Sequence, residues 1–321
     1  MADFFEAIEQ GNSRTVSRGI SGGINVNLRI NRCCTYSDAP ALICAACVEE
    51  PDIVKLLLDA DAEVDRRDWG NNGTALIWAA RTGNVGIVRA LLAAGADIDA
   101  RTTYNDTAMT MAAYNGHLGV VRLLMENGAN YNIRQNGGFT PKSLALIKGH
   151  STISNYIGNG EEFFVAIADG DSRRVRSSLS GGISVDMRNY QCCTYGQASA
   201  LICAACAEEY YIVDLLLDEG ASVNGRDLLN GGTALIWAAR AGNLRIVRLL
   251  VESGANVNAF TETGLDTPLH WAAFKGHFDV VKYLVENRAN VRALQSGSNT
   301  AAALASDQGY MEIARYLLAH S

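Results

Sequence analysis

The sequence predicts an all-α solenoid in which short pairs of helices repeat along the chain and stack on one another. A helical motif recurs about every 33 residues, the 31 glycines punctuate the chain, and only 4 of the 321 residues are proline. Regular glycine with scarce proline is typical of many short helices that end at glycine. One such helix pair cannot bury its own apolar face, but stacked neighbours can, which favours a repeat architecture.

The recurring motif is clearest between Thr267 and His277, where the sequence reads TPLHWAAFKGH. Related segments begin at Thr74, Thr107 and Thr233, and apolar residues at equivalent positions lie 33 or 34 residues apart. We count ten units. Their first helices are expected to begin near Phe4, Leu42, Leu76, Met109, Pro141, Phe163, Leu201, Leu235, Leu269 and Ala301.

Each part of the motif has a physical reason. The hydroxyl of Thr267 can accept a hydrogen bond from an otherwise unpaired N–H, and Pro268 suits the first helical position, where its missing N–H costs nothing. Gly276 is expected to end this first helix. A second helix follows, with an apolar stripe at helical spacing formed by Val280, Val281 and Leu284.

These motifs resemble the ankyrin repeat, which has a period of about 33 residues and the signature TPLH. The resemblance extends over nearly the whole chain. It implies an all-α, ankyrin-repeat solenoid of helix-turn-helix units with β-hairpin fingers, where a finger is the loop between one unit's second helix and the next unit's first helix. It also implies a concave surface of fingers and first helices that binds partner proteins.

A larger duplication is superimposed on the short repeat. The segment ALICAAC occurs from Ala41 and again from Ala200, and several matches share this offset of 159 residues. We therefore expect a first five-unit block over residues 1–157, a junction lacking a finger over 158–162, and a second five-unit block over 163–321. The junction leaves two arrangements open, either a continuous stack with a gap in its row of fingers or two blocks that meet at a bend.

One position predicts a local weakness. Gly95, Gly128, Gly220 and Gly254 follow second helices, where a left-handed backbone is usual. Arg288 occupies the equivalent position in the ninth unit, and a side chain there is expected to be strained.

The charge of the chain argues against some partners and compartments. A formal net charge of −7 makes nucleic acid an unsuitable partner, because phosphates repel acidic surfaces. No apolar run reaches the roughly 18 residues that a membrane span needs. The first ten residues lack a secretory signal pattern, so we expect a location in the cytoplasm or the nucleus, with the 8 cysteines reduced. We also expect a monomer.

No constellation of catalytic residues is recognisable, so we expect a protein that is not an enzyme and needs no cofactor. The histidines fall at repeat positions, in Gly-His turns (His117, His150 and His277) or in the TPLH signature (His270). The resemblance implies that these histidines bond to backbone groups and tie neighbouring units together. No nucleophile elbow and no HExxH motif is present.

The cysteines form the remaining candidate chemistry. Each block carries a Cys-Cys pair followed by a Cys-x-x-Cys motif, which comprises Cys33, Cys34, Cys44 and Cys47 in the first block and Cys192, Cys193, Cys203 and Cys206 in the second. Four thiolates could bind zinc, although the spacing differs from common zinc ribbons and fingers. We therefore expect structural free thiols, with a zinc site or a redox role as the alternatives.

The proposed binding surface follows from exposed aromatic and cationic residues, which anchor many protein interfaces. The candidates come from the fingers and from the ends of the first helices: Tyr36, Trp69, Arg81, Tyr104, Tyr114, Tyr195, Arg240, Phe260, Phe274 and Lys275. The function we expect is a non-catalytic scaffold or adaptor that binds a protein partner on this concave face. A metal or redox sensor acting through the cysteine clusters and a purely structural array are the alternatives.

Overall fold

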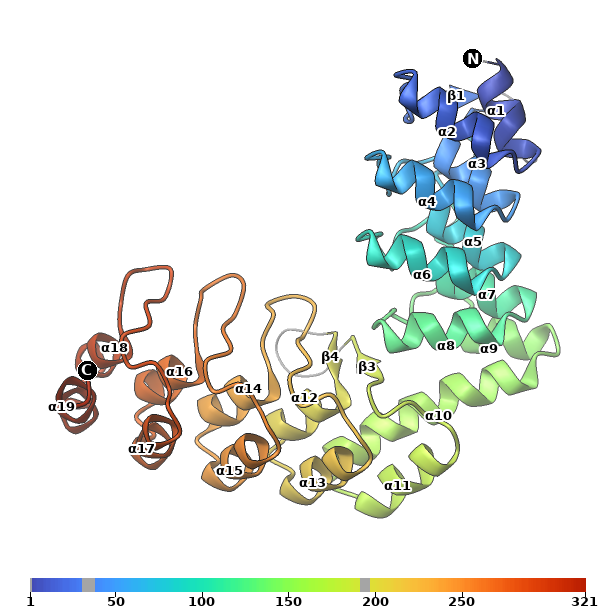
Figure 1. Cartoon of the computed structure of the whole chain (residues 1–321). Helices are drawn as coiled ribbons and strands as arrows, with labels where there is room; N and C mark the ends of the chain where they lie inside the picture. Colours follow the sequence, from blue (N-terminus) through green and yellow to red (C-terminus); the bar gives the residue numbers. More distant parts are fainter. Residues whose placement is uncertain (1, 31–37, 191–196) are drawn as a thin grey trace. The chain divides into compact units, whose positions relative to one another are not determined.

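The computed structural model describes residues 2–30, 38–190 and 197–321. Contacts within the chain divide it into two compact units, Met1–Gly158 and Asn159–Ser321. Each unit is built from helix pairs whose first helices form one row and whose second helices form another (Figure 1). The all-α repeat solenoid that the sequence predicts is therefore confirmed.

Unit 1 contains the helix pairs of the first block. Its first helices are α1 (Ala2–Glu9), α3 (Ala41–Cys47), α5 (Ala75–Thr82), α7 (Ala108–Asn115) and α9 (Pro141–Ile147). Its second helices are α2 (Ser13–Ser21), α4 (Pro51–Asp59), α6 (Val85–Ala93), α8 (Leu118–Glu126) and the start of α10 (Ser151–Ala168). Each first helix packs on the next one along the chain, as α5 does on α3 and α7.

Unit 2 repeats this organisation. The C-terminal part of α10 pairs with α11 (Ser172–Ser180), and the further first helices are α12 (Ala200–Cys206), α14 (Ala234–Ala241), α16 (Pro268–Lys275) and α18 (Ala301–Asp307). Their partners are α13 (Tyr210–Asp218), α15 (Leu244–Glu252), α17 (Phe278–Glu286) and α19 (Met311–Ala319). Helices α5 and α14 both begin with the segment ALIWAAR, a direct trace of the duplication.

The caps and the core follow the repeat motif. Thr267 accepts a hydrogen bond from the His270 N–H, and Gly276 ends α16 in a left-handed conformation with φ of 79°. The paired alanines of the first helices, such as Ala79 and Ala80, are fully buried. Their small side chains let neighbouring first helices approach closely, which is what the stacking requires.

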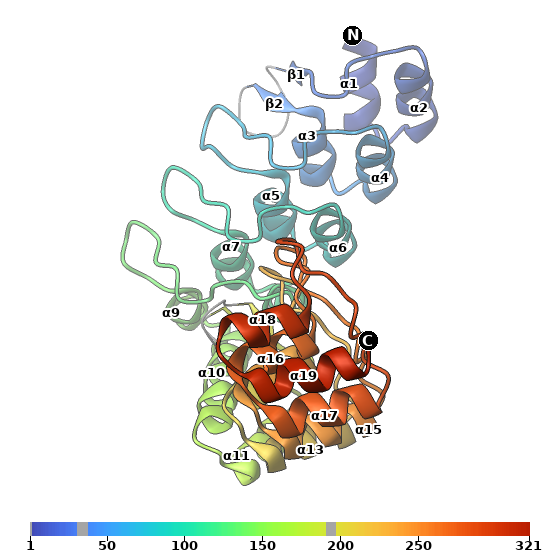
Figure 2. The ribbon, with the colours of Figure 1, turned by 90° about the vertical axis from the view of Figure 1, so that its left-hand side faces the viewer.

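The fingers are hairpin-shaped loops with little regular β-structure (Figure 2). Strand β1 (Arg29–Ile30) pairs antiparallel with β2 (Ala39–Pro40), and β3 (Arg188–Asn189) pairs with β4 (Ala198–Ser199). Consecutive fingers are joined through their backbones, since the Thr103 N–H donates to the Asn71 carbonyl at 2.9 Å and Glu262 N–H to the Asn230 carbonyl at 2.8 Å. These bonds hold the fingers of each unit in a row.

The segment between the two blocks differs from the sequence-based expectation in its local structure. We expected one helix to end near Ile157 and another to begin near Phe163, but α10 runs without a break from Ser151 to Ala168. Neither Gly158 nor Gly160 has a positive φ, so neither glycine turns the chain. The helix persists because one side of it is buried along its whole length, at Ile153, Ile157, Gly160, Phe164 and Ile167.

Arg288 has the left-handed backbone that its position predicts, with φ of 68°. We expect Arg288→Gly to raise the free energy of unfolding by about 1 kcal/mol, because glycine adopts this conformation without a steric penalty. Thermal unfolding followed by circular dichroism would measure the gain. Asp61→Gly, at the equivalent position with φ of 60°, should gain less because Asp tolerates this region better. A lower melting temperature for Arg288→Gly would contradict the explanation.

Candidate partner-binding surface

Aromatic side chains project from the fingers. Trp69 is 79% exposed and Tyr104 is 62% exposed, in consecutive fingers of unit 1. In unit 2, Phe260 is 45% exposed and stacks against the guanidinium of Arg226, whose Cζ lies 5.3 Å from the ring centroid. Apolar area of this kind, held at the tips of ordered loops, is available for contact with another molecule.

The arginines at the ends of the first helices are stacked on tryptophans. The Arg81 guanidinium lies 5.1 Å from the Trp78 ring centroid. The Arg240 guanidinium lies 5.2 Å from the Trp237 ring and 4.7 Å from the Trp271 ring. Stacking restricts these long side chains while leaving their charge in place, which lowers the entropic cost of a further contact.

Histidines of the following helical repeat fix the helix ends that carry these arginines. The His117 Nε2–H donates to the Arg81 carbonyl at 3.0 Å, and the His277 Nε2–H donates to the Arg240 carbonyl at 3.1 Å. The backbone role that the sequence analysis assigns to these two histidines is therefore observed. Each bond ties one helical repeat to the next and orients a candidate binding residue.

In each unit, further first helices also carry aromatic residues and cations. Tyr114 is exposed and lies under the ammonium of Lys148, 4.3 Å from the ring centroid. Phe274 is half-buried and meets Trp271 edge to face at 6.0 Å, while the Lys275 ammonium lies 5.4 Å from the Phe274 ring. Aromatic rings and cations thus alternate along the first helices of each unit.

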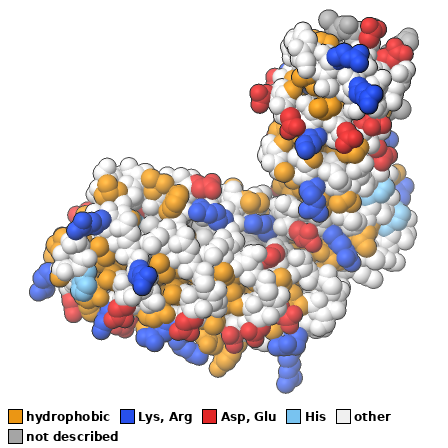
Figure 3. All heavy atoms as spheres, viewed as in Figure 1, with side chains coloured by type: hydrophobic (Ala, Val, Ile, Leu, Met, Phe, Trp, Pro, Cys, Tyr) orange, Lys and Arg blue, Asp and Glu red, His pale blue; other side chains and the backbone are white. Residues whose placement is uncertain are grey.

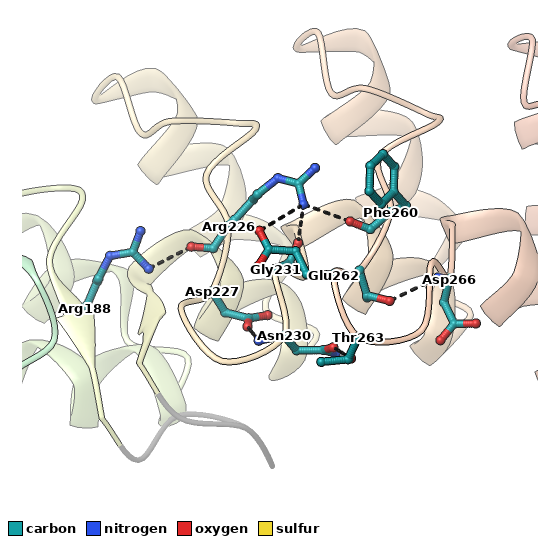
Figure 4. A network of polar contacts seen from close by, with 10 residues as sticks. Arg188, Arg226, Asp227, Asn230, Gly231, Phe260, Glu262, Thr263 and Asp266 are labelled. Carbon is teal, nitrogen blue, oxygen red and sulfur yellow. Dashed lines mark hydrogen bonds and ion pairs between the residues drawn. The ribbon is translucent and has the colours of Figure 1, made fainter. Parts of the chain in front are cut away.

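An arginine network holds the fingers of unit 2 (Figure 4). The Arg188 guanidinium donates to the Arg226 carbonyl at 2.8 Å. Arg226 in turn donates to the Gly231 carbonyl at 3.2 Å within its own finger and to the Phe260 carbonyl at 2.9 Å in the next. Arg67 plays the same part in unit 1, where it donates to the Asn72 and Arg101 carbonyls. The positions of the exposed aromatic residues are therefore set by bonds between fingers.

Burial shifts the pKa values of His270, on α16, and of Asp266, in the finger that precedes α16. Burial lowers the pKa of His270, which accepts the Thr267 N–H at Nδ1 and donates from Nε2 to the Ala293 carbonyl at 3.1 Å. Burial also raises the pKa of Asp266, although His270 acts in the opposite direction. The hydrogen bond to Ala293 makes His270 a cross-link between α16 and the following finger.

The cysteines correct one expectation. We expected free thiols, but Cys44, Cys47 and Cys203 are disulfide-bonded. Disulfide formation needs Cα atoms within about 4.4–6.8 Å, a proximity that spacing along the sequence does not reveal. Cys44 is buried, Cys47 is half-buried, and Cys206 is half-buried on α12.

Several candidates lie outside the described residues: Tyr36 and Tyr195 of the binding surface, and Cys33, Cys34, Cys192 and Cys193 of the cysteine clusters. Over the parts of the chain that are described, no three His, Cys, Asp or Glu side chains form a group that could hold a metal ion. Within the same parts, no helix is both long enough and apolar enough to cross a membrane.

The sequence analysis missed several exposed apolar residues in the fingers. Phe139, Leu265 and Leu294 are exposed to 42%, 42% and 55%. Their signal was present, because each occupies a finger position where most other units carry a polar residue or glycine. On the face shown in Figure 3, apolar side chains are interspersed with charges of both signs rather than gathered under a field of one sign.

Repeated helix pairs, several of which have a first helix that follows threonine and ends at glycine, define a helical-repeat protein whose fingers and first helices form an ordered surface. Comparison with protein-family models identifies the repeat. A model described as ankyrin repeats (3 copies) matches residues 4–102, and one described as ankyrin repeats (many copies) matches residues 85–124, 201–251, 235–285 and 269–318. The chain belongs to the ankyrin-repeat family. No curated protein matches it.

Membership of this family has a general functional meaning. Ankyrin repeats generally mediate protein–protein interaction and are typically non-catalytic modules. The family therefore supports a protein partner for this chain, and it names neither that partner nor the face that binds it.

Proposed function

We propose that this protein is a scaffold or adaptor that binds a partner protein on its fingers and on the ends of its first helices. The observation that carries the proposal is the pairing of Arg81 and Arg240 with tryptophan rings. A histidine of the next helical repeat holds the backbone carbonyl of each arginine. Arginine and large aromatic residues supply most of the binding energy in many protein interfaces.

Preorganisation supports the same proposal. An arginine that binds a partner normally loses rotamer freedom, at a cost of roughly 0.5–1.5 kcal/mol for each immobilised side chain. Stacking on Trp78 or Trp237 has already restricted these side chains before any partner arrives. The finger network limits the movement of Phe260 in the same way. Such a surface is suited to contact with a large molecule.

The compartment is part of the proposal. We propose a monomer that acts in the cytoplasm or nucleus. The disulfide-bonded state of Cys44, Cys47 and Cys203 weighs against this compartment, because thiols there are kept reduced. The cytoplasmic location therefore requires these three cysteines to be reduced in the cell, which alkylation of the protein in freshly lysed cells would test.

We expect a variant with Arg81→Ala, Tyr114→Ala, Arg240→Ala and Phe274→Ala to lose its partner. An affinity pull-down with mass spectrometry identifies the partner of the natural chain, and titration of that purified partner then measures the affinity. Removal of several hot-spot residues should weaken binding by roughly 100-fold or more.

The control for this experiment changes exposed residues of the second helices, Arg89→Ala and Tyr211→Ala, and should bind the partner normally. Circular dichroism must show that all three proteins are folded. Equal recovery by the natural chain and the fourfold variant would show that the ends of the first helices do not bind the partner and would refute that part of the proposal. Loss of the partner from the control as well would show that the effect is not specific to the first helices.

A further inference from the structure

The two blocks differ at the fingers that precede α16 and α18. A cleft of about 420 Å³ lies there, with Phe260, Leu265, Ala293 and Leu294 among its apolar walls and Asn258 and Asn290 on its polar edge. Its volume falls within the range of about 300–1,000 Å³ that is usual for ligand-binding sites. We call it the finger cleft.

The duplication supplies an internal comparison for this cleft. The first-block counterparts of Phe260, Leu265 and Leu294 are Arg101, Asn105 and Arg134. In unit 1 these three residues make polar contacts, since Arg101 donates to the Asn105 side chain and Asn105 donates to the Arg134 carbonyl. In unit 2 all three are apolar, so these bonds within and between fingers are replaced by an apolar surface.

Leu265 is strained as well as exposed. The residue three positions before the first helical residue has a positive φ in every described finger, and its identity is Asp38, Asn72, Asn105, Gly138, Gln197, Gly231, Leu265 and Ser298 in turn. Leucine is the one apolar residue in this series. It has a φ of 56°, a conformation that costs bulky residues free energy, and its side chain remains 42% exposed. Neither strain nor exposure helps folding, which points to a role in binding.

Positive charge flanks the cleft. Arg292 lies between the lining residues Asn290 and Ala293, and the carbonyl of Arg288 accepts a hydrogen bond from Asn258. Both arginine side chains are exposed, and neither forms an ion pair within the described part of the chain. Their first-block counterparts are Asn132 and Gly128. Glu262, by contrast, forms an ion pair with Arg226, with Oε1 of Glu262 lying 3.9 Å from Nη1 of Arg226.

We propose that the finger cleft binds a peptide segment of a partner protein in which a bulky apolar side chain is flanked by carboxylates. The apolar side chain fills the space between Phe260, Leu265 and Leu294, and the carboxylates are attracted by Arg288 and Arg292. The inference rests on the proposed protein-binding function and adds that the second block recognises a chemistry that the first block does not.

The test uses four fluorescein-labelled peptides with a central Leu or Ala, flanked on both sides by Glu or by Lys, titrated against the full chain by fluorescence polarisation. The Leu peptide with Glu flanks should bind about tenfold or more tightly than its Ala counterpart, since burial of a leucine side chain is worth about 1.5–3 kcal/mol. It should also bind more tightly than the Leu peptide with Lys flanks.

A variant with Phe260→Arg, Leu265→Asn and Leu294→Arg restores the first-block residues and should lose this binding. Its melting temperature should be unchanged or higher, because Asn accepts the left-handed conformation, so loss of binding cannot be attributed to unfolding. The control is Leu228→Asn with Leu229→Asn, which removes two exposed leucines from a finger that does not line the cleft. The control should bind like the natural chain.

The inference is overturned if the Leu and Ala peptides bind equally, if no peptide binds at about 1 mM protein, or if the threefold variant binds as well as the natural chain. Dimerisation of the natural chain that the threefold variant abolishes would also overturn it, by showing that a second copy covers the cleft. If the peptides fail but the variant at Arg81, Tyr114, Arg240 and Phe274 loses its partner, the proposed function stands without the cleft. If the peptides bind as expected and that variant keeps its partner, the cleft stands and the first-helix surface is excluded.

Discussion

Replacement of Gly83 by alanine is expected to lower the free energy of unfolding by about 2–3 kcal/mol. Gly83 ends α5 with φ of 91°, and a Cβ atom at this position would lie 2.4 Å from Nδ1 of His117. The alanine therefore brings a backbone penalty and also displaces the ring that bonds to the Arg81 carbonyl. Chemical denaturation followed by circular dichroism would measure the loss.

Gly95→Ala separates the two contributions. Gly95 has a similar φ of 85°, but nothing lies within 4 Å of the added Cβ atom. This variant should lose only about 1 kcal/mol, the cost of the left-handed conformation. Equal losses for the two variants would show that the His117 contact contributes nothing to stability. The position of Arg81 would then not depend on the neighbouring helical repeat.

The second large effect concerns α10. We expect Gly158→Pro to destabilise the protein by about 3 kcal/mol or more, because proline removes a backbone hydrogen bond inside a helix and clashes with the preceding turn. In a loop between two separate helices, which is what the sequence first indicated at 158–162, the same change would be tolerated. Thermal unfolding therefore distinguishes a continuous helix from a broken one.

Gly158→Ala is the matched control for this prediction. Alanine is favoured over glycine in a helix interior by about 0.5–1 kcal/mol. The added Cβ atom would approach only the end of the flexible Lys142 side chain, at 3.1 Å from Nζ. We therefore expect a small gain in stability. A loss on Gly158→Ala together with tolerance of Gly158→Pro would contradict the continuous helix.

Most of the fold follows from the sequence because the repeat states each element several times. Thr107 and Thr267 cap their helices and Gly116 and Gly276 end them, as the motif predicts. Each prediction depends on local backbone chemistry and on small buried residues, and both can be recognised from the sequence. The fold class and nine of the ten expected first-helix starts required nothing further.

The continuous helix could have been predicted but was not. The sequence indicated a junction at 158–162 because one helix was expected to end near Ile157 and the next to begin near Phe163. Ile153, Ile157, Gly160, Phe164 and Ile167 nevertheless maintain alternating spacings of four and three residues, which is the period of one buried helical face. Burial along that face outweighs the roughly 1 kcal/mol that each interior glycine costs.

The candidate site was only partly predictable. Exposure of Trp69 and Tyr104 follows from their finger positions, whereas the stacking of Arg240 between two tryptophans depends on the distance between neighbouring helices. Leu265 escaped attention because the left-handed backbone angle, which strains a leucine at this position, is seen only in the structure. The disulfides of Cys44, Cys47 and Cys203 likewise depend on distances through space.

The shared segment ALIWAAR in α5 and α14 has a consequence for how the chain folds. An unfolded molecule contains two copies that compete for the same place on neighbouring helices, and a helix inserted in the wrong stack would be a kinetic trap of the kind known for repeat proteins. Synthesis from the N-terminus removes this competition for the first block, because its helices can stack before the second copy has been made. Refolding of the complete chain from denaturant lacks that order, so it should yield misassembled molecules that synthesis avoids.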